Sequence, residues 1–340
     1  MKNSDTNYFI HFNNFAPFHR LILLISTVFY VFYSNFNDFE FRCGQAFAQT
    51  GFISSPESSG GADFVYRDML SAVEGATSIS TDVRQQIRMF GQDYKAFGSY
   101  HELKPTEIRE TGAVRFRLDM RMESPADASG TTDANPGNSL TVVRDNSYNF
   151  VYRYLTLEGE KRLERIEIHR VVEAIEKQGR KDIPTEAGSI CGLGGLAGML
   201  LEVQNRYAFQ DEPIRTQINE KNGLEKSKPI DVWKIHGQLK PEIVKRLTVE
   251  VADKKQTIPK HTPTAVDIYI GMSDRFPYRF DYYWSADGKE THSSPFAYLL
   301  FYNIELHTRK NISDAIFDYR PPGNIPPEDI TDKVMNHLLR

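Results

Sequence analysis

Hydrophobic and polar residues alternate with a period of two along most of the chain, a pattern that predicts β-strands. The clearest stretch runs from Tyr269 to Trp284. One set of alternate positions in it is aromatic and consists of Phe276, Tyr278, Phe280, Tyr282 and Trp284. The other set consists of Arg279, Asp281 and Tyr283. Residues 271–274 predict a turn to the apolar run 266–270, so we expect a hairpin with one large aromatic face.

Other segments share this alternation, and residues 113–122 show it best. Phe116, Leu118 and Met120 fall on one predicted face there, and Arg115 and Arg117 fall on the other. A second aromatic row, Phe150 with its neighbours at a spacing of two, predicts another strand. Residues 77–90 also fit a helix, but their β-branched composition favours a strand. The predicted strands are 77–90, 98–103, 113–122, 140–143, 148–155, 163–171, 232–239, 266–270, 276–284, 295–307 and 316–319.

Three segments have helical spacing instead. Residues 62–74 predict a helix that ends at Gly75, and residues 329–339 predict a terminal helix. Residues 189–203 form an uncharged, glycine-rich stretch as far as Glu202. Glycine weakens a helix, so this one needs apolar surroundings, and we expect it to lie over the mouth of a curved sheet as a lid. The intervening segments 124–138, 211–228 and 242–261 are polar and predict loops or connections.

The N-terminus predicts an export signal. His19 and Arg20 precede a dozen apolar or small residues, 21–32, which is the length of a signal-peptide core. Residues 46–48 offer a small-x-small cleavage site, although charged residues separate it from the apolar core. An uncleaved inner-membrane anchor at residues 21–36 is the alternative. We therefore expect residues 1–48 to be a signal peptide or anchor, 49–61 a linker, and 62–340 the folded domain of an exported, periplasmic protein.

Composition excludes several classes of function. The 340-residue chain has a formal net charge of −4 and no basic run, which argues against nucleic-acid binding. Its two cysteines, Cys43 and Cys191, have no zinc-ligand spacing, and the histidines do not pair as metal ligands. The glycines of 192–197 do not follow a strand in a βαβ unit, and no GxSxG sequence occurs. We predict no catalytic residue, metal or cofactor.

The apolar strand faces have two interpretations. Ordinary interiors are filled by side chains, which favours a packed core. A long aromatic row under a greasy helix favours a sheet that curls around an apolar interior able to hold acyl chains. On the second interpretation the plug is Leu193, Leu196 and Leu200. The predicted lining residues are Phe116, Leu118, Phe150, Tyr152, Ile168, Trp233, Ile268, Phe280 and Tyr282.

Several short patterns follow one another in a definite order along the chain. They are the opening helix with Thr77-Ser78-Ile79-Ser80, Phe97-Gly98-Ser99-Tyr100, Arg115-Phe116-Arg117-Leu118, residues 163–171, Gly194-Gly195-Leu196, residues 233–237, Phe276-Pro277-Tyr278-Arg279 and Asp329-Ile330-Thr331. In this order they resemble the outer-membrane lipoprotein carrier (LolA-like) superfamily. The resemblance covers residues 62–339. It implies mainly β structure, a curved antiparallel sheet that forms an incomplete, half-open β-barrel plugged by helices. It also implies an arginine that contacts the lid, either Arg115 or Arg117.

The resemblance implies a non-enzymatic protein that shields lipid or lipoprotein acyl chains in the periplasm. Long polar insertions at 124–138 and 211–228 depart from the superfamily's pattern. We expect a monomer whose partners are acyl chains. The alternative is an envelope sensor or scaffold that binds a protein through the same fold, and an exported hydrolase with dispersed catalytic residues is the weakest hypothesis.

Overall fold

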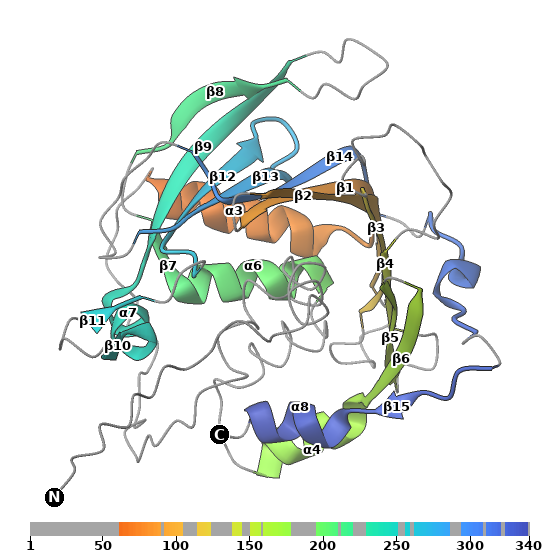
Figure 1. The fold of residues 1–340 in the computed structure, drawn as a ribbon. Coiled ribbons are helices and arrows are strands. Elements are labelled where there is room, and N and C mark those ends of the chain that lie inside the picture. The colour runs from red at the N-terminus through yellow and green to blue at the C-terminus, as the bar shows by residue number, and fades with distance from the viewer. Residues whose placement is uncertain are drawn as a thin grey trace, which may run out of the picture.

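One large curved sheet organises the molecule and does not close into a barrel (Figure 1). The computed structural model describes residues 61–89, 92–104, 114–123, 138–144, 150–157, 159–177, 195–209, 212–219, 229–250, 256–258, 262–285, 294–308, 311–320 and 324–338. The predicted N-terminal signal or anchor, 1–48, lies outside these residues. No helix among the described residues is long and apolar enough to cross a membrane.

The first half of the sheet is a meander in which each strand pairs with the next in antiparallel fashion. Its strands are β1 (Ser78–Met89), β2 (Gln92–Leu103), β3 (Arg115–Met122), β4 (Ser139–Arg144), β5 (Phe150–Leu157) and β6 (Glu160–Glu167). The short β15 (Glu328–Asp329) adds to the β6 edge in parallel. The predicted strand 77–90 is confirmed, as are 98–103 and 113–122.

The second half continues from the other side of β1. In spatial order it consists of β14 (Ala297–His307), β13 (Pro277–Tyr283), β12 (Ala265–Gly271) and β9 (Ile230–Leu239), with β7 (Tyr207–Phe209) and β8 (Ile214–Ile218) beside β9. The predicted hairpin is confirmed as β12 and β13, and Pro277 stands at the strand start that proline tolerates. Two further strands, β10 (Val249–Glu250) and β11 (Gln256–Thr257), form a separate small sheet.

Helices cover the concave side, which we call the inner face. The helix α3 (Ala62–Gly75) and the helix α6 (Gly195–Arg206) lie beneath strands β12 to β2 (Figure 1). The helices α4 (Ile168–Lys177) and α8 (Thr331–Leu338) pack together at the β6 end, and α7 (Pro241–Leu247) follows β9. One hydrophobic cluster joins α3, α4, α6, α8 and the inner faces of the strands.

The opposite side of the sheet is the outer face. A 3-10 helix, η2 (Asp314–Phe317), lies against β3 there. Phe317 and Ile312 form a small separate cluster with Leu103. Leu103 is one residue along β2 from Glu102, so the two side chains leave the sheet on opposite faces.

Four predictions about elements are wrong. The predicted strand 163–171 stops at Glu167, because Ile168, Val171 and Ile175 recur at helical spacing and are buried along one side of α4. Residues 316–319 fall within and just beyond η2 instead of forming a strand. The polar connection 211–228 contains the edge strand β8, and the loop 242–261 contains α7, β10 and β11.

Candidate functional site

The candidate site is the inner face together with the helix that covers it. In β12 and β13, Val266, Ile268 and Phe280 alternate with polar residues and are fully buried. Paired residues of neighbouring antiparallel strands share a face, and Ile268 is paired with Phe280. The same face continues through Leu299, Val83 and Tyr100 to Leu118, so six adjacent strands present one apolar surface.

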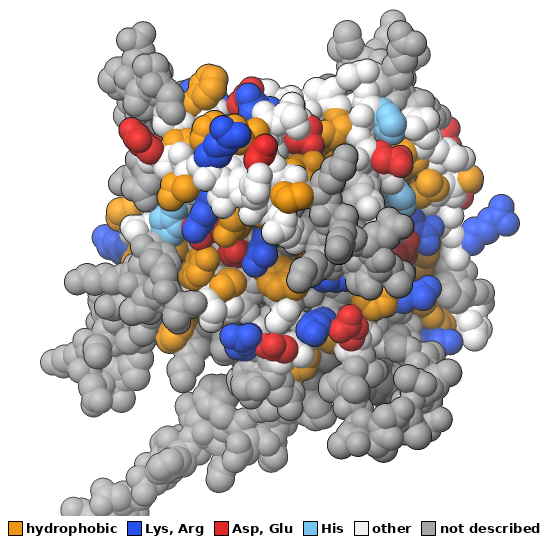
Figure 2. Space-filling model, turned by 90° about the horizontal axis from the view of Figure 1, so that it is seen from above, with side chains coloured by type: hydrophobic (Ala, Val, Ile, Leu, Met, Phe, Trp, Pro, Cys, Tyr) orange, Lys and Arg blue, Asp and Glu red, His pale blue; other side chains and the backbone are white. Residues whose placement is uncertain are grey.

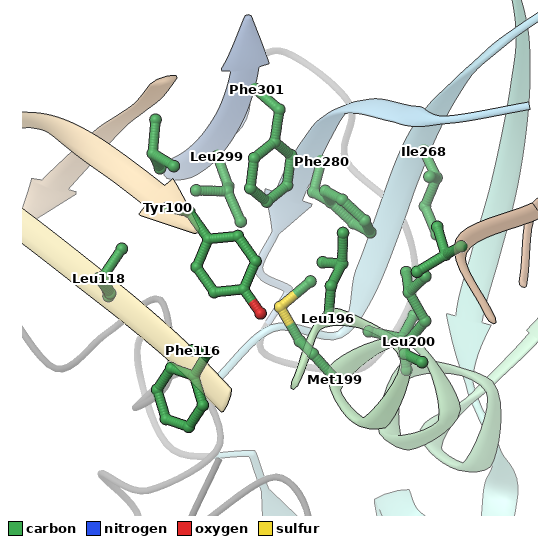
Figure 3. Packing of buried hydrophobic residues seen from close by; sticks show 14 of the residues in the cluster. Tyr100, Phe116, Leu118, Leu196, Met199, Leu200, Ile268, Phe280, Leu299 and Phe301 are labelled. Atoms are coloured by element: carbon green, nitrogen blue, oxygen red, sulfur yellow. The ribbon is translucent and has the colours of Figure 1, made fainter. Parts of the chain in front are cut away.

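Helix α6 covers this surface with four side chains. Leu196, Met199, Leu200 and Val203 are all buried, and Figure 3 shows the first three facing Tyr100, Phe116 and Phe280 from the strands. Tyr66 of α3 donates a 2.6 Å hydrogen bond to the carbonyl oxygen of Leu200. The aromatic ring of Tyr66 also stacks on Phe209 at 4.7 Å, which ties α6 to α3 and to the strand that follows α6.

The start of α6 is held by a buried carboxylate from the sheet. Oε2 of Glu102 accepts a 2.7 Å hydrogen bond from the backbone N–H of Leu196 and a 2.5 Å bond from the hydroxyl of Tyr100. A negative charge there also stabilises the positive end of the helix dipole. Gly195 has a φ of +58°, and a Cβ at that position would lie 2.4 Å from Oε2 of Glu102. The close approach therefore requires glycine.

Lys104, two residues after Glu102 and just past the end of β2, holds the C-terminal end of α3. Its ammonium group donates to the carbonyl oxygens of Val73 and Glu74 at the end of that helix, the second at 2.9 Å. It also lies 3.8 Å from Oε1 of Glu102. One partly buried ion pair thus joins the end of α3 to the start of α6. Burial raises the pKa of the Glu102 carboxyl, although Lys104 and the two hydrogen bonds oppose the rise.

The structure brings most of the predicted lining residues to the inner face. Phe116, Leu118, Ile268, Phe280 and Tyr282 are buried in the main hydrophobic cluster. They are covered by the chain's own helices, so α6 would have to move before a ligand could touch them.

Two further predicted lining residues and two of the predicted plug residues lie at or near this face. Ile168 is also in the cluster, but it opens α4 instead of lying on a strand. Trp233 pairs with Ile270 and so faces inward, partly exposed. Of the predicted plug residues, Leu196 and Leu200 lie in α6, and Leu193 lies outside the described residues.

Phe150 and Tyr152 were predicted as lining residues, but they lie on the outer face. Val151 and Leu155 of the same strand belong to the inner cluster, and side chains one residue apart point to opposite faces. Tyr152 contacts the ring of Tyr319 at 5.3 Å on that outer side. The aromatic row was read correctly as a strand face, but its direction depends on the neighbouring strands.

Arg115 and Arg117 also project from the outer face, because they alternate with Phe116 and Leu118. Arg115 forms a 2.7 Å ion pair with Asp314, and Arg117 donates to the carbonyl oxygen of Ile316 at 3.1 Å. Within the described part of the chain, both therefore hold η2 and not α6. Glu102 was not identified from the sequence. It could have been found as a charged side chain at a position of β2 that faces the apolar interior.

The outer face carries a second polar network over β9, β12 and β13. The view of the molecule from above shows acidic, basic and histidine side chains interspersed with hydrophobic ones (Figure 2). Asp267 accepts bonds from Nδ1 of His236 at 2.6 Å, from Lys234 at 2.8 Å and from the hydroxyl of Tyr283 at 2.9 Å. Burial would raise the pKa of Asp267, but these three donors lower it overall. A histidine–aspartate pair alone supplies neither a nucleophile nor an oxyanion site. The network therefore neutralises the charge of the buried Asp267 carboxylate. In the described ranges, no group of three His, Cys, Asp or Glu side chains is placed to hold a metal.

Comparisons with known proteins find matches among solved structures alone. No protein-family model matches the chain, and no curated protein matches it. An uncharacterized conserved protein from Thermus thermophilus is 14% identical, with 77% of this chain and 98% of that chain covered and a TM-score of 0.35. A putative outer membrane lipoprotein-sorting protein domain from Vibrio parahaemolyticus is 10% identical, with coverages of 75% and 95% and a TM-score of 0.30.

A LolA superfamily protein from Nitrosomonas europaea is also similar, at 11% identity, with coverages of 75% and 97% and a TM-score of 0.24. Structures of the superfamily that the sequence patterns resemble are thus among the matches. These likenesses are distant, and the function below is argued from this chain's own residues.

Proposed function

We propose that the protein is a carrier that shields lipid or lipoprotein acyl chains, and that α6 is the plug that an acyl chain replaces. The observation that carries the proposal is the continuous apolar inner face, spread over six strands and covered by α3 together with the glycine-containing helix α6. Apolar walls are sufficient to hold a hydrocarbon chain, and such a site needs few polar groups. No chemical reaction forms part of this function.

The free energy lost when α6 leaves the inner face is similar in size to the free energy gained when an acyl chain takes its place. Leaving the inner face would expose Leu196, Met199, Leu200 and Val203, at about 1.5–3 kcal/mol each, or roughly 6–12 kcal/mol together. A buried acyl chain contributes about 0.8 kcal/mol per methylene, which is on the order of 10 kcal/mol for a long chain. Gly198, inside the helix, lowers the intrinsic stability of α6 by about 1 kcal/mol relative to alanine. A reversible exchange of helix for ligand is therefore physically reasonable.

The first test is to look for lipid in the protein and for uptake of a fluorescent fatty acid. We expect native mass spectrometry of protein purified without delipidation to show a bound lipid mass. Tyr66→Phe, which removes the hydroxyl that binds the Leu200 carbonyl, should accelerate uptake because α6 is held less firmly. Tyr152→Phe is the matched control on the outer face and should leave the rate unchanged.

The proposal fails if repeated preparations carry no lipid and take up no fatty acid. Recovery of one stoichiometric protein partner without lipid would favour the alternative, an envelope sensor or scaffold. We propose that the carrier works in the periplasm and that residues 1–48 are its signal peptide or anchor. N-terminal sequencing of the mature protein tests this assignment, because a mature chain that begins at Met1 would contradict cleavage.

A further inference from the structure

The inner face changes character where the sheet descends through β4, β5 and β6 (Figure 1). Arg153 stands between Val151 and Leu155, both of the inner hydrophobic cluster, at a spacing of two residues. Arg144 is paired with Val151, and Arg162 is paired with Leu155. Because paired residues share a face, all three arginines project from the inner side.

Among the described residues, two carboxylates form ion pairs with Arg153 and Arg162. The carboxylate of Glu164 forms ion pairs with both Arg153, at 3.2 Å, and Arg162, at 3.0 Å. A second carboxylate, Glu328 of β15, lies 2.9 Å from Arg162 and is shared with Lys333. Within the described residues, the buried Nε of Arg162 has no hydrogen-bond partner. Three cations, Arg153, Arg162 and Lys333, thus share two carboxylates, and one donor of Arg162 stays open.

The exposure of the arginines increases across the three strands. Arg144 is buried, the side chain of Arg153 is 19% exposed and that of Arg162 is 41% exposed. The row therefore leads from the apolar interior to water. Phe116 and Leu118 of the next strand, β3, continue the same face as hydrocarbon. An amphiphile needs this order, with an apolar wall for its chain and cations at the water boundary for its head.

We propose that Arg153 and Arg162 bind the anionic head group of a lipid whose chain lies on the inner face, an inference that rests on the carrier function proposed above. Guanidinium groups present paired N–H donors that match the oxygens of a carboxylate or phosphate. A head-group oxyanion takes up the open donor of Arg162 and the positive charge that Glu164 and Glu328 leave. The ligand class is therefore a lipid with an oxyanion head.

The test compares two ligands with the same chain and different heads. The full chain is titrated with a fluorescent fatty acid and with its methyl ester. We expect the wild type to bind the acid on the order of tenfold more tightly than the ester, since a charge-assisted hydrogen bond contributes that much. Arg153→Gln should abolish the preference by weakening the binding of the acid.

Two further variants complete the experiment. Arg162→Gln lies at the exposed end, should fold even where Arg153→Gln does not, and should also reduce the preference. Arg165→Gln is the matched control, because Arg165 lies on the outer side of the same strand beside Asp329, at 3.1 Å. It should keep the full preference for the acid.

The outcomes separate the two proposals. Equal binding of acid and ester by the wild type, or an unchanged preference in Arg153→Gln and Arg162→Gln, overturns the head-group site and leaves the carrier standing. Failure of both ligands to bind overturns the carrier and the head-group site together. Inorganic phosphate is the third arm. If it displaces the acid as effectively as an unlabelled fatty acid does, the arginines bind free oxyanions and the lipid assignment is wrong.

Discussion

Gly98 shows how closely two strands of this sheet approach at a single residue. A Cβ built at Gly98 would lie 1.7 Å from the carbonyl oxygen of Asp119 in β3, and backbone atoms cannot yield as a flexible side chain does. We therefore expect Gly98→Ala to destabilise the protein by about 1–3 kcal/mol, the usual cost of overpacking. Urea unfolding followed by circular dichroism measures the change.

Gly75 provides the control, because nothing lies within 4 Å of a Cβ built there. Gly75→Ala should change the free energy of unfolding by no more than about 0.5 kcal/mol. Equal effects of the two substitutions would contradict the close approach of β2 and β3. Sequence alone suggested no special role for Gly98, because the distance between neighbouring backbones is a property of the paired strands.

At the scale of elements, the attachment of α6 should respond to pH through Glu102. The pKa of this carboxyl is raised above its ordinary value of 4.5 by burial, and it returns towards that value once water reaches it. The folded form therefore binds the proton more tightly than the unfolded form does. This contribution to stability is full below the ordinary pKa and is lost as pH rises through the raised pKa.

Urea unfolding at a series of pH values tests this expectation without a lipid. Across that window, the free energy of unfolding of the wild type should fall by about 1.4 kcal/mol for each unit by which the Glu102 pKa differs between the folded and unfolded forms. The free energy of unfolding of Glu102→Gln should fall by less. The titratable groups that face Glu102 are Tyr100 and Lys104, with Glu74 of α3 behind the lysine. Lys104→Gln removes the cation that opposes the rise, so it should move the window to higher pH. Identical pH profiles for wild type and Glu102→Gln would refute the assignment.

Elements were predictable where local pattern and tertiary packing agree. The β12–β13 hairpin has strict alternation, a turn at residues 272–274 and buried aromatic side chains, so local and global preferences coincide. Residues 163–171 mislead because Ile166 and Ile168 also fit a strand of period two. The choice of helix from Ile168 is made by the packing of Val171 and Ile175 against the core, and this packing is not local information.

At the scale of the whole molecule, the direction of each aromatic row depends on the register of the entire sheet. Phe280 and Tyr152 both lie in alternating aromatic rows, yet the first faces inward and the second outward. A shift of one residue exchanges the two faces of a strand, so single-strand patterns cannot decide between them. The curved sheet was predictable from composition and periodicity, whereas the inward position of Arg153 and the contact of Glu102 with α6 became visible only when strands were paired.

One hydrophobic cluster runs from α3 to α8, so we expect the described domain to unfold in a single cooperative transition. Val73 of α3 and Val334 of α8 are both buried in this cluster, and Figure 1 shows their helices at opposite ends of the interior. Val73→Ala and Val334→Ala should each cost about 1–3 kcal/mol through the cavities they leave. Because the sites share no contacts at such a separation, their effects should add in the double variant.

Differential scanning calorimetry distinguishes this expectation from independent halves. In one cooperative unit, either substitution lowers the same melting transition, and the double variant lowers it further by the sum. In two units, Val73→Ala would shift one transition and leave a second unmoved, while Val334→Ala would do the converse. The second result would mean that the wall formed by β4, β5 and β6 with α4 and α8 folds apart from the face under α6. A ligand with its chain on one part and its head on the other would then join two units, and bound lipid should merge their transitions.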